Sequence, residues 1–120
     1  MDLHLKGKVV FVTGGFKGIG KGIVFQLARE GVTPIVLNRK DGVEDQFKKE
    51  LDEVTKTYEV YYIDLNNTDE IRPIVEEVYK KYGHIDGVVN NAGKNDNKDL
   101  ETTSWREFEK SIHGNLTHYY

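Results

Sequence analysis

Two kinds of segment alternate along this chain. Short runs rich in β-branched and aromatic residues, at 9–13, 34–37, 60–63 and 85–89, predict four strands. Between them, apolar residues recur every three or four positions, which predicts helices. Strands that alternate with helices pair in parallel, because each crossover needs a helix to carry the chain back.

Apolar stripes and terminal signals locate the helices. The first helix is defined by Ile19, Ile23 and Leu27 on one face, with Val24 and Ala28 beside them. The stripes that define the second and last helices are Phe47, Leu51 and Val54; and Trp105, Phe108, Ile112, Leu116 and Tyr119. Gly31 and Gly83 predict the ends of the first and third helices, and Asn67 or Thr68 predicts a cap at the start of the third. A polar loop over 94–101 precedes the last helix.

The order of these elements predicts the fold class. A chain of 120 residues forms one domain at most, and right-handed crossovers place its helices on both faces of a parallel sheet. We therefore predict an α/β, Rossmann-type doubly wound parallel sheet, here partial, with strand order 3-2-1-4. The strand order reverses between the first and fourth strands, so a ligand is expected in the crevice at their carboxyl ends.

A glycine-rich turn at 13–20 joins the first strand to the first helix. Gly14 is expected to make the tight turn, Gly18 to let a phosphate approach, and Gly20 to let the helix pack on the sheet. The free N–H groups at the helix start favour a pyrophosphate. The other turn residues predicted to contact this ligand are Phe16, Lys17 and Ile19. Because the spacing departs from the common G-x-G-x-x-G pattern, a turn without a ligand is the alternative.

Three further strand ends are expected to line the same crevice. Asn38 and Arg39 follow the second strand, and Asp64 and Leu65 follow the third. The Asp64 carboxylate can accept a hydrogen bond from the adenine amino group, and Leu65 can lie against the adenine ring. The segment 90–93 combines small residues, for approach to a ribose, with amides that tie neighbouring strands. Its predicted contacts are Asn90, Ala92 and Gly93. Each residue has an alternative as an ordinary loop residue, but together they favour a dinucleotide site.

Composition excludes several classes of partner, metal site and cellular location. The net charge of -3 argues against a nucleic-acid partner, and the absence of cysteine excludes disulfides and thiolate metal sites. The four histidines are scattered, so no metal site is predicted. The first residues are too polar for a signal peptide and no apolar run is long enough to cross a membrane, so we expect a cytoplasmic protein.

Taken together, Thr13-Gly14-x-x-x-Gly18-Ile19-Gly20, Asp64 and the segment 90–93 resemble the pattern of the short-chain dehydrogenase/reductase family. The resemblance implies an NAD(P)-dependent oxidoreductase that acts on a secondary alcohol or carbonyl of a small-molecule substrate. It also implies a homo-oligomer for the full-length enzyme. The residue pattern of 107–112 and 115–120 most resembles that of the L-fucose and related sugar dehydrogenases of this family.

The resemblance gives Asn115 a catalytic role. It matches the helical asparagine of the family's Asn-Ser-Tyr-Lys group, whose backbone carbonyl holds a water in a proton relay; a buried asparagine with structural bonds is the alternative. The family's serine and Tyr-x-x-x-Lys follow later, and Tyr119 and Tyr120 have no lysine four residues on. We therefore expect residues 1–120 to be the N-terminal, cofactor-binding part of the domain, truncated before that segment and inactive alone.

The choice between NAD and NADP depends on the ribose 2′ position. An acidic residue at the end of the second strand would bind the 2′-hydroxyl and repel a phosphate, whereas this chain has Asn38, Arg39 and Lys40 there. With Lys17 in the glycine turn, these residues favour NADP over NAD. Two other interpretations remain: a non-catalytic dinucleotide-binding sensor or scaffold domain, and an S-adenosylmethionine-dependent methyltransferase, against which the segment 90–93 argues.

Overall fold

The computed structural model describes residues 2–40, 42–93, 101 and 103–115. One sheet of four parallel strands runs in the order β3-β2-β1-β4, as predicted. The strands are β1 (Val9–Thr13), β2 (Thr33–Asn38), β3 (Glu59–Tyr62) and β4 (Gly87–Val89). The helices are α1 (Gly18–Arg29), α2 (Glu44–Asp52), the short 3-10 turn η1 (Thr68–Glu70), α3 (Ile71–Tyr82) and α4 (Trp105–Asn115). The predicted Rossmann-type α/β fold is confirmed.

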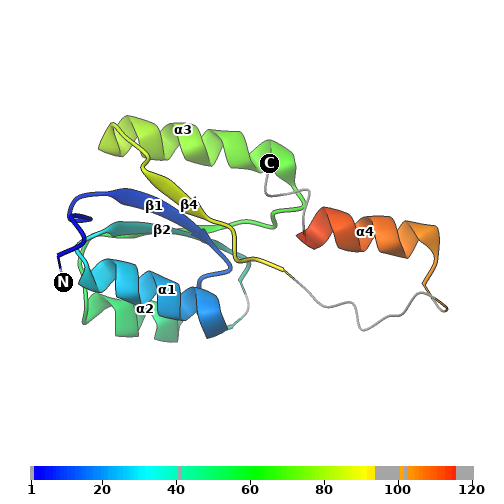
Figure 1. Cartoon of the computed structure of the whole chain (residues 1–120), viewed down its shortest axis with the longest axis horizontal. Coiled ribbons are helices and arrows are strands. Elements are labelled where there is room, and N and C mark those ends of the chain that lie inside the picture. The colour runs from blue at the N-terminus through cyan, green and yellow to red at the C-terminus, as the bar shows by residue number, and fades with distance from the viewer. Residues whose placement is uncertain (1, 41, 94–100, 102, 116–120) are drawn as a thin grey trace.

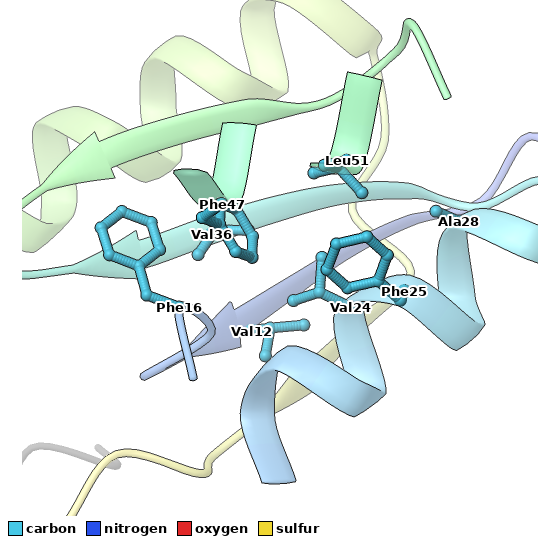
Figure 2. Close-up of a cluster of buried hydrophobic side chains, with 8 residues drawn as sticks. All are labelled: Val12, Phe16, Val24, Phe25, Ala28, Val36, Phe47 and Leu51. Atoms are coloured by element: carbon cyan, nitrogen blue, oxygen red, sulfur yellow. The ribbon is translucent and has the colours of Figure 1, made fainter. Parts of the chain in front are cut away.

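Helices cover both faces of the sheet. Figure 1 shows α1 and α2 on one face, α3 on the other, and α4 beyond the carboxyl ends of the strands. The cluster on the α1 and α2 side, drawn in Figure 2, consists of Val12, Phe16, Val24, Phe25, Ala28, Val36, Phe47 and Leu51. The cluster on the α3 side consists of Val9, Phe11, Ile35, Leu37, Ile63 and Val78. Because β1 and β2 contribute to both clusters, their sequences are apolar throughout rather than alternating.

The buried face of α1 is centred on Val24 and Ala28, which were predicted beside the main stripe, and Ile23 and Leu27 of that stripe pack at its edge. Val24 and Ala28 face the core, and Gly20 lies on the same stripe, whereas Ile19 is 78% exposed. The helix carries two apolar stripes one residue apart. The stripe with Gly20 and Ala28 is the one buried, because small side chains let the helix backbone approach the sheet.

Several element ends also differ from the prediction. Helix α2 ends at Asp52, so Val54 lies outside it. Neither Asn67 nor Thr68 provides a side-chain cap: the carbonyl oxygen of Asn67 accepts the N–H of Glu70 at 3.1 Å, and η1 forms before α3. Strand β4 begins at Gly87 rather than residue 85, and β3 spans 59–62 rather than 60–63.

The two glycines predicted to end helices do so. Gly31, after α1, and Gly83, after α3, have φ values of 81° and 82°. This left-handed conformation suits glycine, which has no Cβ to clash with the preceding turn.

Helix α4 begins with a reciprocal cap. The Ser104 hydroxyl accepts the N–H of Glu107 at 3.1 Å, and the Glu107 carboxylate accepts the N–H of Ser104 at 3.4 Å. The apolar face predicted for this helix is not buried. Its exposed fractions are 67% at Trp105, 53% at Phe108 and 39% at Ile112. Leu116, Tyr119 and most of the predicted polar loop lie outside the described residues.

Asp86 ties the start of β4 to the start of β1. Its carboxylate accepts the Val9 N–H at 2.8 Å, while its own N–H donates to the Val9 carbonyl at 2.8 Å. The Nδ1 atom of His84 lies 2.6 Å from the same carboxylate. The Val9 N–H, aided by His84, holds the pKa of Asp86 below its usual value of 3.8.

We expect Asp86→Asn to lower the free energy of unfolding at neutral pH and to flatten its acid dependence. A depressed folded-state pKa means that the carboxylate stabilises the fold above its unfolded pKa, and that this contribution is lost as the pH falls through the folded-state pKa. Urea unfolding from pH 7 down to pH 2.5 should therefore show wild type and variant converging in acid.

Asp69→Asn is the matched control, because no hydrogen bond to its carboxylate occurs within the described residues. It should retain the wild-type acid dependence. A constant difference between wild type and Asp86→Asn at every pH would contradict the assignment.

Candidate cofactor site

The hydroxyl of Thr13 joins the end of β1 to the segment after β4. It accepts the N–H groups of Asn91 and Ala92, each at 3.0 Å, and donates to the Val89 carbonyl at 3.4 Å. Thr13 is 5% exposed. All of its hydrogen-bonding capacity is thus used inside the protein, where an unpaired hydroxyl would be costly.

Asn91 and Gly14 complete this connection. The Asn91 side-chain amide donates to the Gly14 carbonyl at 3.0 Å, and the Gly14 N–H donates to the Leu37 carbonyl at 2.9 Å. The φ of Gly14 is 67°, which confirms its predicted place in the tight turn. Three neighbouring strands, β2, β1 and β4, are therefore held together at the turn.

Gly20 and Gly18 serve the turn in different ways. A Cβ at Gly20 would overlap the Gly14 carbonyl oxygen and lie 2.5 Å from the Asn91 side-chain nitrogen, so Gly20 allows α1 to close against the turn. At Gly18, where φ is 62°, a Cβ would meet nothing within 4 Å. The backbone of Gly18 is therefore open to a ligand, as a phosphate-binding turn requires.

Sequence reasoning missed Gly15 and assigned Phe16 incorrectly. A Cβ at Gly15 would lie 2.8 Å from a methyl of Val36, so only glycine fits there; the pair of adjacent glycines was the available signal. The Phe16 side chain is 2% exposed and packs on Phe47 with ring centroids 4.8 Å apart (Figure 2). The predicted cofactor contact by Phe16 is therefore wrong for its side chain, which anchors the turn in the core.

The start of α1 is suited to an anion. Lys17 is the N-cap residue, its own side chain makes no capping hydrogen bond, and the first turn of the helix contains no acidic residue. The first N–H of the helix ladder is that of Lys21, which donates to the Lys17 carbonyl at 3.3 Å. The N–H groups of Gly18, Ile19 and Gly20 come before it, and such groups carry the partial positive charge of the helix start. The turn thus fits a pyrophosphate.

The ends of β2 and β3 lie beside the turn. The Asn38 side-chain amide donates to the Arg39 carbonyl at 2.6 Å, and the Asn38 carbonyl accepts the Ile63 N–H at 3.0 Å. The Asp64 carboxylate accepts the Asn66 N–H at 2.9 Å. Arg39 is exposed, and Leu65 is half-buried against the cluster on the α3 side. The structure thus brings the residues predicted at these two strand ends to the same edge of the sheet.

Asn115, at the end of α4, lies beside the segment after β4. Its amide nitrogen donates to the Ser111 carbonyl at 2.9 Å and lies 3.4 Å from the Ser111 hydroxyl. A Cβ at Gly93 would lie 2.9 Å from the Asn115 side-chain oxygen. Asn115 is half-buried and Asn90 is exposed. The candidate catalytic asparagine is therefore a neighbour of Gly93, one of the predicted ribose contacts.

Two classes of feature have no counterpart in the part of the chain that the structure describes. No three histidine or acidic side chains gather there in an arrangement that would hold a metal ion. None of its helices has the length and apolarity needed to span a bilayer.

Comparison with known proteins places this site in a family. The family model for short chain dehydrogenase matches residues 8–120. The 3-oxoacyl-[acyl-carrier-protein] reductase FabG of Thermotoga maritima is 37% identical over 91 residues, which cover 76% of this chain and 37% of that protein. The 3beta-hydroxysteroid dehydrogenase 2 of Eggerthella lenta is 32% identical over 110 residues, covering 88% and 42%. The chain belongs to the short chain dehydrogenase family.

A solved structure agrees with this assignment. The crystal structure of Cj0485 dehydrogenase is 45% identical to this chain and superposes with a TM-score of 0.93, covering 100% of this chain and 45% of the other. The chain thus spans between 37% and 45% of the length of these three relatives. Membership of the family confirms the resemblance drawn from the glycine turn, Asp64 and the segment 90–93.

The fit of Gly20 against the turn leads to a prediction about stability. Gly20→Ala should lower the free energy of unfolding by about 1–3 kcal/mol, because its Cβ would displace the Gly14 carbonyl and the Asn91 amide. Gly22→Ala, also in α1, should raise it by about 0.5–1 kcal/mol, since a Cβ there meets nothing within 4 Å. Urea denaturation followed by circular dichroism measures both. Equal effects of the two substitutions would contradict the packing described for Gly20.

Proposed function

We propose that this chain supplies the dinucleotide-binding part of an NAD(P)-dependent oxidoreductase that interconverts a secondary alcohol and its carbonyl. The observation that carries the proposal is the open, positive-φ backbone of Gly18 in the first turn of α1, next to the point where the strand order reverses between β1 and β4. Family membership supports the same reaction class. The nicotinamide would supply the hydride chemistry.

Each part of the dinucleotide has candidate partners. The N–H groups of Gly18, Ile19 and Gly20 would hold the pyrophosphate. The remaining contacts are those predicted from the strand ends. Asp64 and Leu65 would receive the adenine, and Asn90, Ala92 and Gly93 the nicotinamide-side ribose.

We propose NADP as the preferred dinucleotide. The last residue of β2 is not acidic: Asn38 donates its amide to the Arg39 carbonyl, and Arg39 is exposed beside it. A guanidinium can bind the 2′-phosphate with charge-assisted hydrogen bonds, and Lys17 lies in the adjoining turn.

Asn115 is proposed as a catalytic residue, and its position next to Gly93 supports a role near the nicotinamide. The 120 residues contain no Tyr-x-x-x-Lys segment. In the family pattern that segment provides the acid/base tyrosine, so we expect negligible hydride transfer from these residues alone.

A sugar is the proposed substrate, with L-fucose as the first candidate. The support for a sugar is the resemblance of 107–112 and 115–120 to sugar dehydrogenases. The names of the two curated relatives, an oxoacyl reductase and a hydroxysteroid dehydrogenase, support only the secondary alcohol or carbonyl chemistry. We also propose a cytoplasmic location and, for the full-length enzyme, a homo-oligomer.

Titration of the chain with NADPH and NADH, followed by nicotinamide fluorescence, tests the cofactor assignment. Wild type should bind NADPH more tightly. Arg39→Leu should weaken NADPH binding by about tenfold, the equivalent of one charge-assisted hydrogen bond, and leave NADH binding nearly unchanged.

Arg72→Leu is the matched control, because Arg72 is an exposed arginine on α3. It should leave both affinities unchanged. Failure of a chain with folded circular dichroism to bind either dinucleotide would contradict the proposed function.

A further inference from the structure

Two lysines gather on one aromatic ring at the end of β3. The ammonium groups of Lys40 and Lys48 each lie 5.1 Å from the centroid of the Tyr62 ring. Lys40 follows β2, Lys48 belongs to α2, and the Tyr62 side chain is 38% exposed. None of the ion pairs formed among the described residues involves either ammonium group.

Tyr62 is the cross-strand neighbour of Asn38. The two residues are paired in the parallel register of β2 and β3, and paired residues of adjacent strands share a face of the sheet. That face is the one covered by α1 and α2, because Tyr62 meets the Phe16 ring edge-on with centroids 6.0 Å apart. The ring that carries the two lysines is therefore adjacent to the strand end at which the ribose 2′ position is expected.

Aromatic contacts fix this arrangement. Phe16 of the glycine turn packs on Phe47 of α2 as well as on Tyr62. Lys48 is the next residue after Phe47, and Lys17 is the next residue after Phe16. The buried rings thus hold together the backbone segments that carry Lys17, Lys40 and Lys48.

The charge arrangement favours an anion. The quadrupole of the ring attracts each ammonium to the ring face. Because both ammonium groups lie 5.1 Å from the same centroid, they cannot be farther apart than twice that distance, and their charges repel each other. A bound anion removes this repulsion and gains from both charges. Exposure of the ring leaves the position accessible from solvent.

We propose that Lys40 and Lys48, held on the Tyr62 ring, form a second cationic group, besides Lys17 and Arg39, that binds the 2′-phosphate of NADP. Lys48 is then a specificity-determining residue contributed by α2, remote in sequence from the glycine turn and from the end of β2. This inference rests on the proposed function, since it concerns the same dinucleotide.

Isothermal titration calorimetry with two nucleotides tests the inference. Adenosine 2′,5′-bisphosphate and adenosine 5′-monophosphate differ only in the 2′-phosphate. Lys48→Met should weaken binding of the bisphosphate by about threefold to fivefold, the upper part of the range for a solvent-accessible charge pair, and leave the monophosphate within about twofold. The double variant Lys40→Met/Lys48→Met should lose more of the bisphosphate affinity than either single variant.

Lys49→Met is the matched control, because it removes the same charge from the adjacent, exposed position on α2. It should bind both nucleotides as wild type does. Equal losses in Lys48→Met and Lys49→Met, or no loss in Lys48→Met, would overturn the inference while leaving the proposed function intact. A wild-type chain that binds the two nucleotides equally would overturn both the inference and the proposed preference for NADP, while leaving the proposed dinucleotide site intact. Binding of neither nucleotide by the folded wild-type chain would overturn both the inference and the proposed function.

Discussion

The Thr13 hydroxyl, buried at the end of β1, accepts the N–H groups of Asn91 and Ala92 and so fixes the continuation of β4 against the glycine turn. The Asn91 amide returns to the Gly14 carbonyl, and Gly20 approaches both groups so closely that a side chain would displace them. Most hydrogen-bonding groups at this junction are therefore bonded to one another. What remains at the surface is the backbone of Gly18 and the helix start, which is the arrangement that an anion needs.

The buried side chain of Phe16 attaches the glycine turn to further elements of the site. A turn with two adjacent glycines and a third three residues later would be flexible by itself, but its one aromatic side chain is buried against Phe47 and Tyr62. The turn is thereby attached to α2 and β3 as well as to β4. Ligand contacts placed on so many packed elements are held in position before a ligand binds, which lowers the entropic cost of binding.

Local signals in the sequence predicted much of this structure. Strand order followed from alternation of strands and helices, and Gly14, Gly31 and Gly83 could be assigned because each conformation with positive φ occurs at a recognisable element end. The misplaced features depend on contacts between distant residues. Two adjacent stripes on α1 looked equivalent until the close approach at Gly20 decided between them, and the exposed stripe of α4 shows that periodicity identifies an apolar face but not what it contacts. The lysines on Tyr62 come from segments whose proximity no periodicity encodes.

The proposed dinucleotide site lies at the carboxyl edge of the sheet, over the glycine turn. Backbone amide chemical shifts, recorded by NMR during titration with NADPH, test this position residue by residue. We expect the largest changes at Gly18, Ile19, Arg39, Asn90 and Gly93, with little change at Gly7, Gly31 and Gly83, which lie away from this edge. Changes concentrated at the latter three residues, or no changes at saturating NADPH, would contradict it.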